Sequence, residues 1–422
     1  MQKQTITGFL TLSLGLLGCV NQPQPQTKFD SLTAIEINSG DTPEMYGSRL
    51  VAWYPELGKA IIGQAADSQL YLQSSQPNVG SIRVLETRKA AAALGMPVDS
   101  SGWATWGSGW ATWGSGWATW GSGQGSIFGT GQNQAVWDQI KLADARVAFP
   151  KLGLGIKIAV IDTGIDLNHP AFATRLVAPT ERYDFVDNDA IPQEVLGEAY
   201  GHGTNIAGII AQIAEKAQIM PLRVLDKNGI GDSDDVIAAI NWAVQKGAKV
   251  INLSLGTFAS EAVALALDNA TRKGIFVVTA SGNNGDQNVN FPARACGRDG
   301  KNGRWGDMAI SVTSVGKTDQ LSSFSSYGRD DVGMSAPGEL IYAPAPDNRV
   351  AAWSGTSMAT PMVSASLALA LAERTYSDIR KLGKAVKEKS RDIEKINPNY
   401  KKAIGYGRLD LLLFAQEVKK IK

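Results

Sequence analysis

Short apolar runs alternate with amphipathic segments from about Asn133 to the C-terminus. Each run has the length of a buried β-strand. The runs lie at residues 157–161, 219–225, 250–255 and 275–280. Two segments between them have helical spacing; one starts near Asp232 or Ser233 and stops at Gly247, and the other covers residues 260–273. Strands separated by helices in this way predict a parallel sheet with helices on both faces.

Residues 28–97 have a different pattern, in which short apolar runs are separated by polar breaks. Two runs occur at 49–54 and 59–63, and a segment of helical character follows at 85–95. A segment of this total length can bury only a modest core. We therefore expect a small α+β domain ahead of the larger one.

The N-terminus has the features of an export signal. Lys3 supplies a positive charge, and the apolar stretch 6–17 is too short to span a membrane. The stretch runs into LLGC at 16–19, which resembles the lipobox of bacterial lipoproteins and implies cleavage directly before Cys19 and lipidation of that cysteine. A plain secretory signal that contains a cysteine is the alternative. Residues 19–27 are polar and proline-rich, as a tether to a membrane would be.

Residues 98–132 contain three copies of the heptad SGWATWG, which hold six of the chain's eleven tryptophans. Glycine and serine indicate a flexible linker, whereas tryptophans three residues apart indicate a surface for stacking. Two interpretations stay open: a low-complexity linker, or a strip that binds glycan, cell wall or the protein's own surface. A coiled coil is excluded because glycine fills two positions of every repeat.

Composition adds little about partners. The 422-residue chain has 41 Lys and Arg against 40 Asp and Glu, so charge predicts no nucleic-acid partner. Its two cysteines, Cys19 and Cys296, lie in such different contexts that no disulfide framework is expected. Cys296 has no histidine beside it, which favours a structural thiol over a nucleophile.

Three glycine-rich motifs hold, in chain order, an aspartate, a histidine and a serine. They are IDTGID at 161–166, GHGT at 201–204 and GTSMATP at 355–361. A serine hydroxyl such as that of Ser357 attacks a carbonyl only when a neighbouring base takes its proton. An imidazole such as that of His202 titrates near neutrality and can take that proton and return it. A carboxylate such as that of Asp162 holds the imidazole in the right tautomer.

These motifs, in this order, resemble those of the subtilisin-like serine proteases, and the resemblance covers nearly all of residues 133–422. It implies a subtilisin-like α/β fold, with a mostly parallel sheet and helices on both faces, preceded by a small α+β propeptide-like domain. It also implies Ser357 as nucleophile, His202 as general base and Asp162 as the residue that orients the imidazole. The other histidine, His169, is expected to be structural.

The same resemblance implies further site residues. Asn283 matches the motif that supplies a hydrogen-bond donor to the oxyanion. Ser254, Leu255 and Gly256 resemble the edge segment that pairs with an extended substrate by β-augmentation. We expect Ser357 to open an apolar helix in which Pro361 lies in the first turn, where no backbone donor is lost.

Position and length suggest how the protein matures, since subtilisin-like proteases commonly carry a propeptide of this size at this place. The expected parts are a signal peptide at 1–18, a tether at 19–27, a propeptide at 28–97, a linker at 98–132 and a catalytic domain at 133–422. A cut by the enzyme itself between about Asp99 and Asn133 would separate the catalytic domain from the lipid on Cys19. Maturation and release are therefore expected to be one event.

The segment DFVDNDAIPQ at 184–193 resembles a calcium loop of some thermostable relatives. Calcium prefers several oxygen ligands, which Asp184, Asp189, the Ile191 carbonyl and Gln193 would supply. A polar surface turn without an ion is the alternative. No cofactor is expected for the chemistry itself.

The sequence thus predicts an exported serine endopeptidase, membrane-anchored or released after self-cleavage. Its expected partners are polypeptide substrates, its own propeptide and, through Cys19, a membrane. The alternative is a surface adhesion or scaffold lipoprotein that binds a polymer through its tryptophan repeats.

Overall fold

The computed structural model describes residues 29, 31–64, 84–89, 92–93, 131–257, 259–298 and 303–421. The predicted signal peptide, Cys19 and the tryptophan repeat lie outside these ranges. No helix within the described ranges combines the length and the apolar character that crossing a membrane requires.

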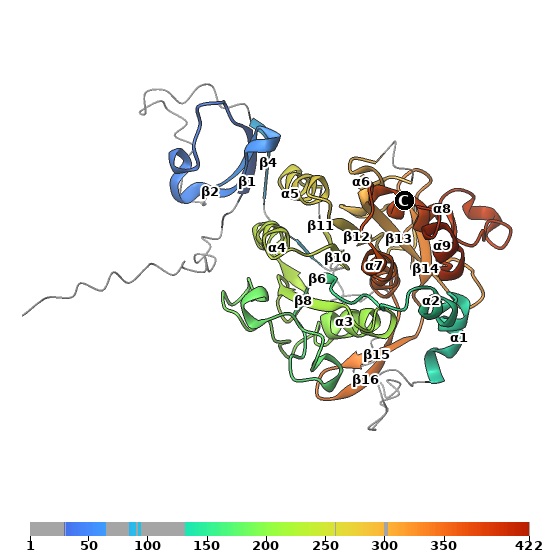
Figure 1. Cartoon of the computed structure of the whole chain (residues 1–422). Helices are drawn as coiled ribbons and strands as arrows, with labels where there is room; N and C mark the ends of the chain where they lie inside the picture. The colour runs from blue at the N-terminus through green and yellow to red at the C-terminus, as the bar shows by residue number, and fades with distance from the viewer. Residues whose placement is uncertain are drawn as a thin grey trace, which may run out of the picture.

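A seven-stranded parallel sheet forms the centre of the larger domain (Figure 1). Its strand order is β14-β13-β12-β10-β6-β8-β7. The strands are β6 Lys157–Asp162, β7 Tyr183–Asp184, β8 Gln218–Arg223, β10 Val250–Leu253, β12 Phe276–Ala280, β13 Ala309–Val315 and β14 Met334–Pro337. Strands β6, β8, β10 and β12 correspond to the four predicted runs, so the predicted α/β fold with a mostly parallel sheet is confirmed.

Helices cover both faces of this sheet. Alternate residues of a strand point to opposite faces, and in β6 Ile158 and Val160 join the apolar cluster of α3 and α7, whereas Ala159 and Ile161 join that of α4 and α5. The helices are α1 Gln134–Gln139, α2 Leu142–Ala148, α3 His202–Ile213, α4 Ser233–Gln245, α5 Glu261–Arg272, α6 Ala293–Cys296, α7 Thr356–Glu373, α8 Arg380–Glu388 and α9 Leu411–Val418.

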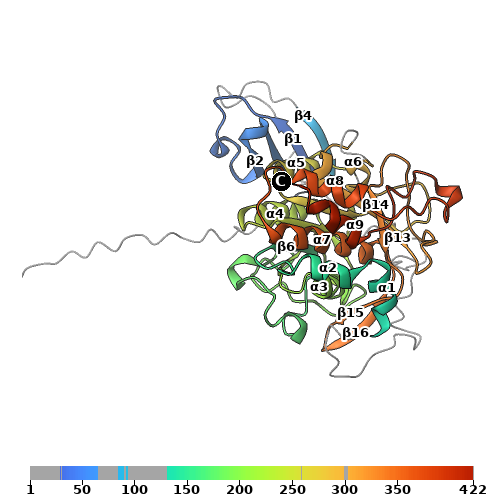
Figure 2. The same cartoon turned by 45° about the vertical axis from the view of Figure 1, so that its right-hand side comes forward.

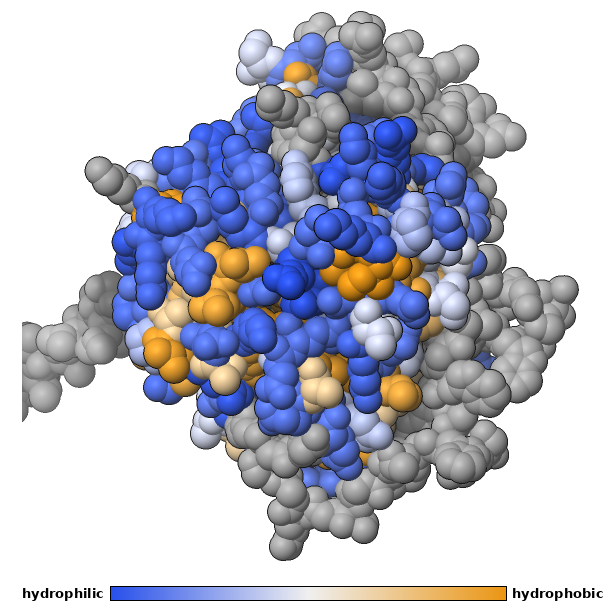
Figure 3. Space-filling model, turned by 90° about the vertical axis from the view of Figure 1, so that its right-hand side faces the viewer, coloured by the Kyte–Doolittle hydropathy of each residue, from blue (hydrophilic) through white to orange (hydrophobic). Residues whose placement is uncertain are grey.

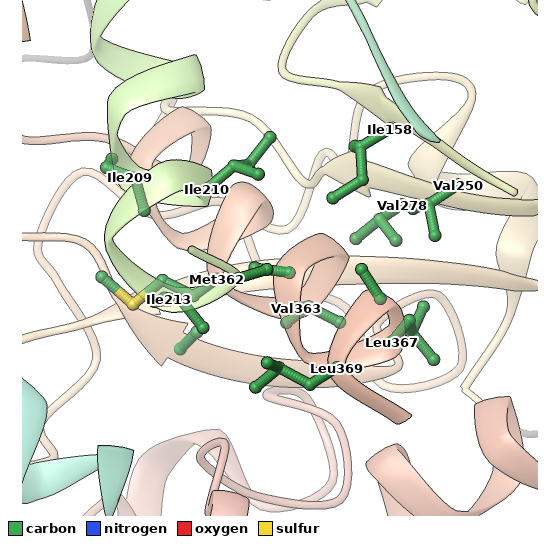
Figure 4. Close-up of a cluster of buried hydrophobic side chains, with 14 of the residues drawn as sticks. Ile158, Ile209, Ile210, Ile213, Val250, Val278, Met362, Val363, Leu367 and Leu369 are labelled. Atoms are coloured by element: carbon green, nitrogen blue, oxygen red, sulfur yellow. The ribbon is translucent and has the colours of Figure 1, made fainter. Parts of the chain in front are cut away.

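The cluster on the α3 and α7 face is the larger core. Figure 4 shows β-branched residues of three central strands packed near α3 and α7. The labelled side chains are Ile158, Ile209, Ile210, Ile213, Val250, Val278, Met362, Val363, Leu367 and Leu369. Burying each such side chain contributes about 1.5–3 kcal/mol. Helix α7 is buried continuously from Thr356 to Ala370 because its side chains are small or apolar all round.

An antiparallel four-stranded sheet, in the order β2-β3-β1-β4, makes up the described part of the N-terminal region. Its strands are β1 Ser31–Glu36, β2 Leu50–Tyr54, β3 Lys59–Gln64 and β4 Val84–Lys89. Figures 1 and 2 both place this sheet beside α4 and α5. Leu32, Ala34 and Tyr54 belong to the same apolar cluster as those two helices. The Tyr54 hydroxyl also donates to Asn241 Oδ1 on α4, at 3.1 Å.

The helix predicted at 85–95 is wrong. Residues 84–89 form β4, and residues 92–93 form the short strand β5. The alanines around position 92 favour a helix in isolation. Pairing with β1, and with strands β9 and β11 of the larger domain, supplies backbone partners that override this propensity.

The described residues also form two smaller sheets. Strands β15 Ile341–Ala345 and β16 Arg349–Trp353 form an antiparallel hairpin. Strand β5 Ala92–Ala93 lies between β9 Ile230–Gly231 and β11 Gly256–Thr257. Short 3₁₀ helices lie at Pro43–Arg49, Pro55–Leu57, Gly131–Asn133, Pro170–Phe172, Pro179–Glu181, Gly306–Met308 and Pro398–Tyr400. The described surface in Figure 3 is mostly hydrophilic, with apolar residues in small separate patches.

Candidate active site

Asp162 and His202 meet at the carboxyl end of the sheet. Asp162 is the last residue of β6, and His202 is the first residue of α3. His202 Nδ1 lies 2.6 Å from Asp162 Oδ1, and both side chains are buried. The Thr163 N–H also donates to Asp162 Oδ1, at 2.8 Å. The imidazole therefore has its Nδ1 held by a carboxylate that is itself fixed by the backbone.

Ser357 is the second residue of α7 and is held against the end of β10. Its hydroxyl donates to the Ser254 carbonyl oxygen at 3.1 Å, and the Ser254 hydroxyl donates to the Ser357 carbonyl oxygen at 2.9 Å. Asn252 Nδ2 donates to Ser254 Oγ at 3.0 Å and so orients that hydroxyl. The predicted substrate-edge residue Ser254 thus contacts the predicted nucleophile directly.

The prediction that Pro361 lies in the first turn of its helix is wrong. Helix α7 begins at Thr356, which places Pro361 in the second turn. Proline at this position lacks the N–H that would bond the Ser357 carbonyl, four residues earlier. The Ser254 hydroxyl occupies that acceptor instead. The backbone bond lost to Pro361 is therefore replaced by a bond that links α7 to Ser254, the residue after β10.

Asn283 lies in the loop after β12, facing the start of α7. Its Oδ1 accepts from both the N–H and the hydroxyl of Thr356, each at 2.9 Å. Because Thr356 needs an acceptor there, the amide orientation is fixed, and Asn283 Nδ2 points away from Thr356. Gly282 makes the turn with φ of +111°, where a Cβ would lie 2.6 Å from Asn290 Nδ2. Asn283 is thus placed as a fixed N–H donor near the start of α7.

The edge formed by β11 is paired with the N-terminal region. In antiparallel register, Gly256 pairs with Ala93 and Thr257 pairs with Ala92. On its other side β5 pairs with β9, Ala92 with Gly231 and Ala93 with Ile230. Strand β5, an extended segment of this same chain, thus lies between β9 and β11. Strand β11 begins at Gly256, two residues after Ser254. This arrangement is how an extended peptide adds to a sheet edge.

A model of the subtilase family, Peptidase_S8, matches residues 153–407. The chain belongs to the subtilase family. This subtilase is 41% identical over 240 residues to thermitase of Thermoactinomyces vulgaris, a match that covers 54% of this chain and 79% of thermitase. It is 37% identical over 267 residues to the thermophilic serine proteinase of Bacillus sp. strain AK1, covering 61% of this chain and 60% of that protein.

Among solved structures, the crystal structure of a cold adapted subtilisin-like serine proteinase matches 56% of this chain and 83% of that chain. The sequence identity is 34% and the TM-score is 0.49. With relatives that are serine proteinases and a family model over most of its larger domain, this subtilase is a serine endopeptidase.

Two side chains beside the Asp162–His202 pair were not found from the sequence. The Trp353 ring, at the end of β16, lies 5.9 Å from the His202 ring between centroids. Glu194 is buried between α3 and Thr163, and burial, with a smaller effect from the charge of Asp162, raises its pKa to about 8. Neither residue stands in a motif. Trp353 reaches His202 from a strand distant in sequence, and Glu194 is defined by how its loop folds back onto Gly201, Thr204 and Thr163.

The predicted calcium ligands lie in one loop of this subtilase. Asp184 Oδ1 accepts from two backbone amides of the loop, Asp189 Oδ1 accepts from the Ile191 N–H, and Gln193 Oε1 accepts from the Leu167 N–H. The buried Arg223 guanidinium donates to Asp184 Oδ2 at 2.6 Å and also contacts Asp187. The donor set is all oxygen, as calcium requires, but Arg223 already supplies positive charge to two of the carboxylates.

His169 and Cys296, the other candidate groups, are both buried. His169 is buried, with Nδ1 accepting from the Ala171 N–H and Nε2 against the Arg349 carbonyl. Burial raises the pKa of the Cys296 thiol, which keeps it protonated and unreactive. An acidic group that was not predicted lies beside β9. It consists of Asp232, Asp234 and Asp235, and one carboxylate oxygen from each residue lies within 4.8 Å of the others.

Proposed function

We propose that this subtilase is an exported endopeptidase that processes itself, with Ser357 as nucleophile and His202 as general base. Asp162 is proposed to orient the imidazole. The observation that carries this proposal is the 2.6 Å contact between His202 Nδ1 and Asp162 Oδ1, with Ser357 at the start of the buried helix on the same side of the sheet.

The chemistry follows from these positions. The Ser357 hydroxyl turns from the Ser254 carbonyl to His202, which takes its proton while Asp162 stabilises the imidazolium. Ser357 Oγ attacks the substrate carbonyl, and His202 then returns the proton to the leaving amine, which leaves an acyl-enzyme. Water, activated by His202 in the same way, releases the acyl group and restores the serine.

Two donors are proposed to stabilise the oxyanion. One is Asn283 Nδ2, whose orientation Thr356 fixes. The other is the Ser357 N–H, which lies in the first turn of α7, where amides have no intrahelical acceptor. The α7 dipole favours the same negative charge. Donors fixed before the reaction stabilise the transition state without having to reorganise.

Self-processing is supported by the position of β5. Ala92 and Ala93 occupy the edge that a substrate would use, and Gly256 of that edge is two residues from Ser254, which contacts Ser357. The chain downstream of Ala93 therefore starts close to the nucleophile. We propose that residues 28–97 are a propeptide that inhibits the catalytic domain at 133–422. Inhibition would end when the chain is cut within the linker at 98–132.

Export and anchoring rest on the sequence alone. The proposed signal peptide covers residues 1–18, and lipid on Cys19 with the tether at 19–27 would hold the precursor to a membrane. Because the anchor precedes the proposed propeptide, self-cleavage would release the catalytic domain into the extracytoplasmic space.

A fluorophosphonate probe tests the proposed nucleophile, since an unactivated serine does not react. We expect labelling of Ser357 and hydrolysis of casein by the purified wild-type protein, and neither by Ser357→Ala or His202→Ala. Proteolysis by purified Ser357→Ala would refute the proposal. A wild-type protein that neither labels nor cleaves, but binds polymer, would favour the adhesion alternative.

A structural calcium ion in the loop 184–193 is a further proposal. Asp184, Asp189, the Ile191 carbonyl and Gln193 would hold it, and it would stabilise the loop that leads to His202 rather than take part in the chemistry.

A further inference from the structure

Glu194 is a buried carboxyl group that the proposed chemistry does not use. It stands eight residues before His202 in the loop that leads to α3, and only 5% of its surface is exposed. Burying a carboxylate is unfavourable unless its oxygens receive hydrogen bonds. The hydrogen-bond partners of Glu194 therefore indicate its role.

All three partners belong to segments that carry the Asp162–His202 pair. Glu194 Oε1 accepts from the Thr204 N–H at 3.0 Å, and Oε2 accepts from the Gly201 N–H. These amides flank His202 at the start of α3, where helical N–H groups have no intrahelical acceptor. The Thr163 hydroxyl donates to Glu194 Oε1 at 3.1 Å. Thr163 is the residue that follows Asp162.

Thr163 completes the connection between the two segments. Its hydroxyl oxygen accepts from the Gly203 N–H at 3.0 Å, so it contacts α3 as well as Glu194. The same hydroxyl lies 3.3 Å from Asp162 Oδ1. A hydroxyl has one proton to donate, so Glu194 competes with Asp162 for it. Glu194 therefore affects both the position of α3 and the hydrogen bonding of Asp162.

We propose that Glu194 is a positioning residue for the Asp162–His202 pair, holding the start of α3 against the end of β6. The proposal rests on the proposed function, because it assigns Glu194 a role in the same reaction. Misplacing a catalytic group by about 1 Å costs about 100-fold in rate. Without the Glu194 side chain, the Gly201 and Thr204 amides lose their acceptor, and the Thr163 hydroxyl is left to donate to Asp162 Oδ1 instead.

The test compares Glu194→Gln and Glu194→Ala with Glu198→Gln, an exposed glutamate in the same loop. Each full chain is purified, its processing rate is followed, and the processed enzyme is assayed with a peptide amide. Titrating Ser357 with a fluorophosphonate normalises kcat to the number of competent active sites. Glutamine keeps one acceptor oxygen, but its NH₂ group faces either the Gly201 N–H or both the Thr204 N–H and the Thr163 hydroxyl.

We expect kcat per titrated site to fall about 10-fold in Glu194→Gln and about 100-fold in Glu194→Ala, with KM within about twofold. Glu198→Gln should match the wild type. A fall in the number of active sites with unchanged kcat per site would show a merely structural role and overturn the proposal.

Thr163→Val keeps the proposal testable if Glu194→Ala does not fold. This variant removes the hydroxyl and leaves the Glu194 bonds to α3, so kcat per site should fall with KM unchanged. If the wild type is active and neither Glu194→Gln nor Thr163→Val lowers kcat per site, the positioning role of Glu194 is refuted, while the proposed function stands. An inactive, unlabelled wild type would instead refute the proposed function.

Discussion

At the scale of single residues, the orientation of the Asn283 amide follows from its neighbours. Thr356 offers two donors to Oδ1, which directs Nδ2 elsewhere. The sequence identified Asn283 by its motif, but the orientation depends on Thr356, 73 residues later. Removal of one such donor from a subtilisin costs about 10²–10³ in kcat.

We therefore predict that Asn283→Ala lowers kcat about 10²–10³-fold with little change in KM. Asn283→Asp keeps Oδ1 for Thr356 but replaces the N–H donor with an oxygen, so it should lose at least as much. Steady-state kinetics on a peptide amide measures both variants. An Asn283→Asp enzyme with wild-type kcat would contradict the proposed oxyanion donor.

His169 gives a prediction about pH. Burial lowers its pKa, and its neutral ring bonds Ala171 and Arg349. An unfolded histidine titrates near pH 6.5. Below that pH the unfolded chain binds a proton that the folded chain resists, so His169 stabilises the fold above about pH 6.5 and this stability is lost as the pH falls.

In an uncleavable Ser357→Ala background, the free energy of unfolding should therefore drop more between pH 7 and pH 5 with His169 than with His169→Gln. Urea unfolding at both pH values measures the difference. Equal drops in the two proteins would show that His169 is not held neutral by the fold.

The residue scale also shows where prediction from sequence stops. Asp162, His202 and Ser357 could be proposed from the sequence because each stands in a glycine-rich motif, and the structure places them at the end of a strand or the start of a helix. Trp353 could not, because only tertiary packing brings it to His202, and Glu194 could not, because its contacts with Gly201 and Thr204 depend on the fold of an irregular loop. Arg223 beside Asp184 was missed for the same reason.

At the scale of elements, local pattern predicted the catalytic domain better than the N-terminal region. The run at 275–280 became β12, and α5 begins after Ser260, whose hydroxyl accepts from the Val263 N–H. Apolar runs and helix caps are local signals, so they survive in the fold. The strand β5 has no apolar alternation of its own, and its pairing with β9 and β11 could not be predicted.

The contact between β2 and α4 gives a prediction about release of the N-terminal region. Tyr54 is buried there, and truncating a buried aromatic residue costs about 3–5 kcal/mol. Tyr54→Ala should therefore speed dissociation of the two pieces after cleavage, seen as earlier peptidase activity and loss of co-elution. Lys59→Ala is the control, since its ion pair with Glu261 is 4.0 Å long and part exposed and contributes under about 1 kcal/mol. Equal release in both variants would contradict this account of the interface.

The loop between β7 and α3 gives a prediction about metal. We expect Ca²⁺ to raise the Tm of the Ser357→Ala chain, EDTA to reverse the rise, and Asp189→Asn to remove it. Asp234→Asn is the control, because Asp234 belongs to the separate acidic group beside β9. A Tm that does not respond to calcium, or a response lost in Asp234→Asn instead, would contradict a site at 184–193.

At the scale of the whole molecule, the order of parts along the chain connects chemistry with location. The proposed anchor at Cys19 precedes the N-terminal sheet, and Asp162, His202 and Ser357 all follow it. The sheet packs on α4 and α5, while β5 pairs with β11, the proposed substrate edge. One cut between about Asp99 and Asn133 would therefore free the proposed active site and separate the catalytic domain from the proposed anchor.

N-terminal sequencing of the purified wild-type protein beside Ser357→Ala tests this account most directly. The wild type should yield a catalytic fragment that begins between about residues 99 and 133, and Ser357→Ala should remain one chain with its N-terminal region attached. The same new N-terminus in purified Ser357→Ala, formed without added wild-type enzyme, would show that Ser357 does not make the cut. That result would contradict self-processing by the proposed triad.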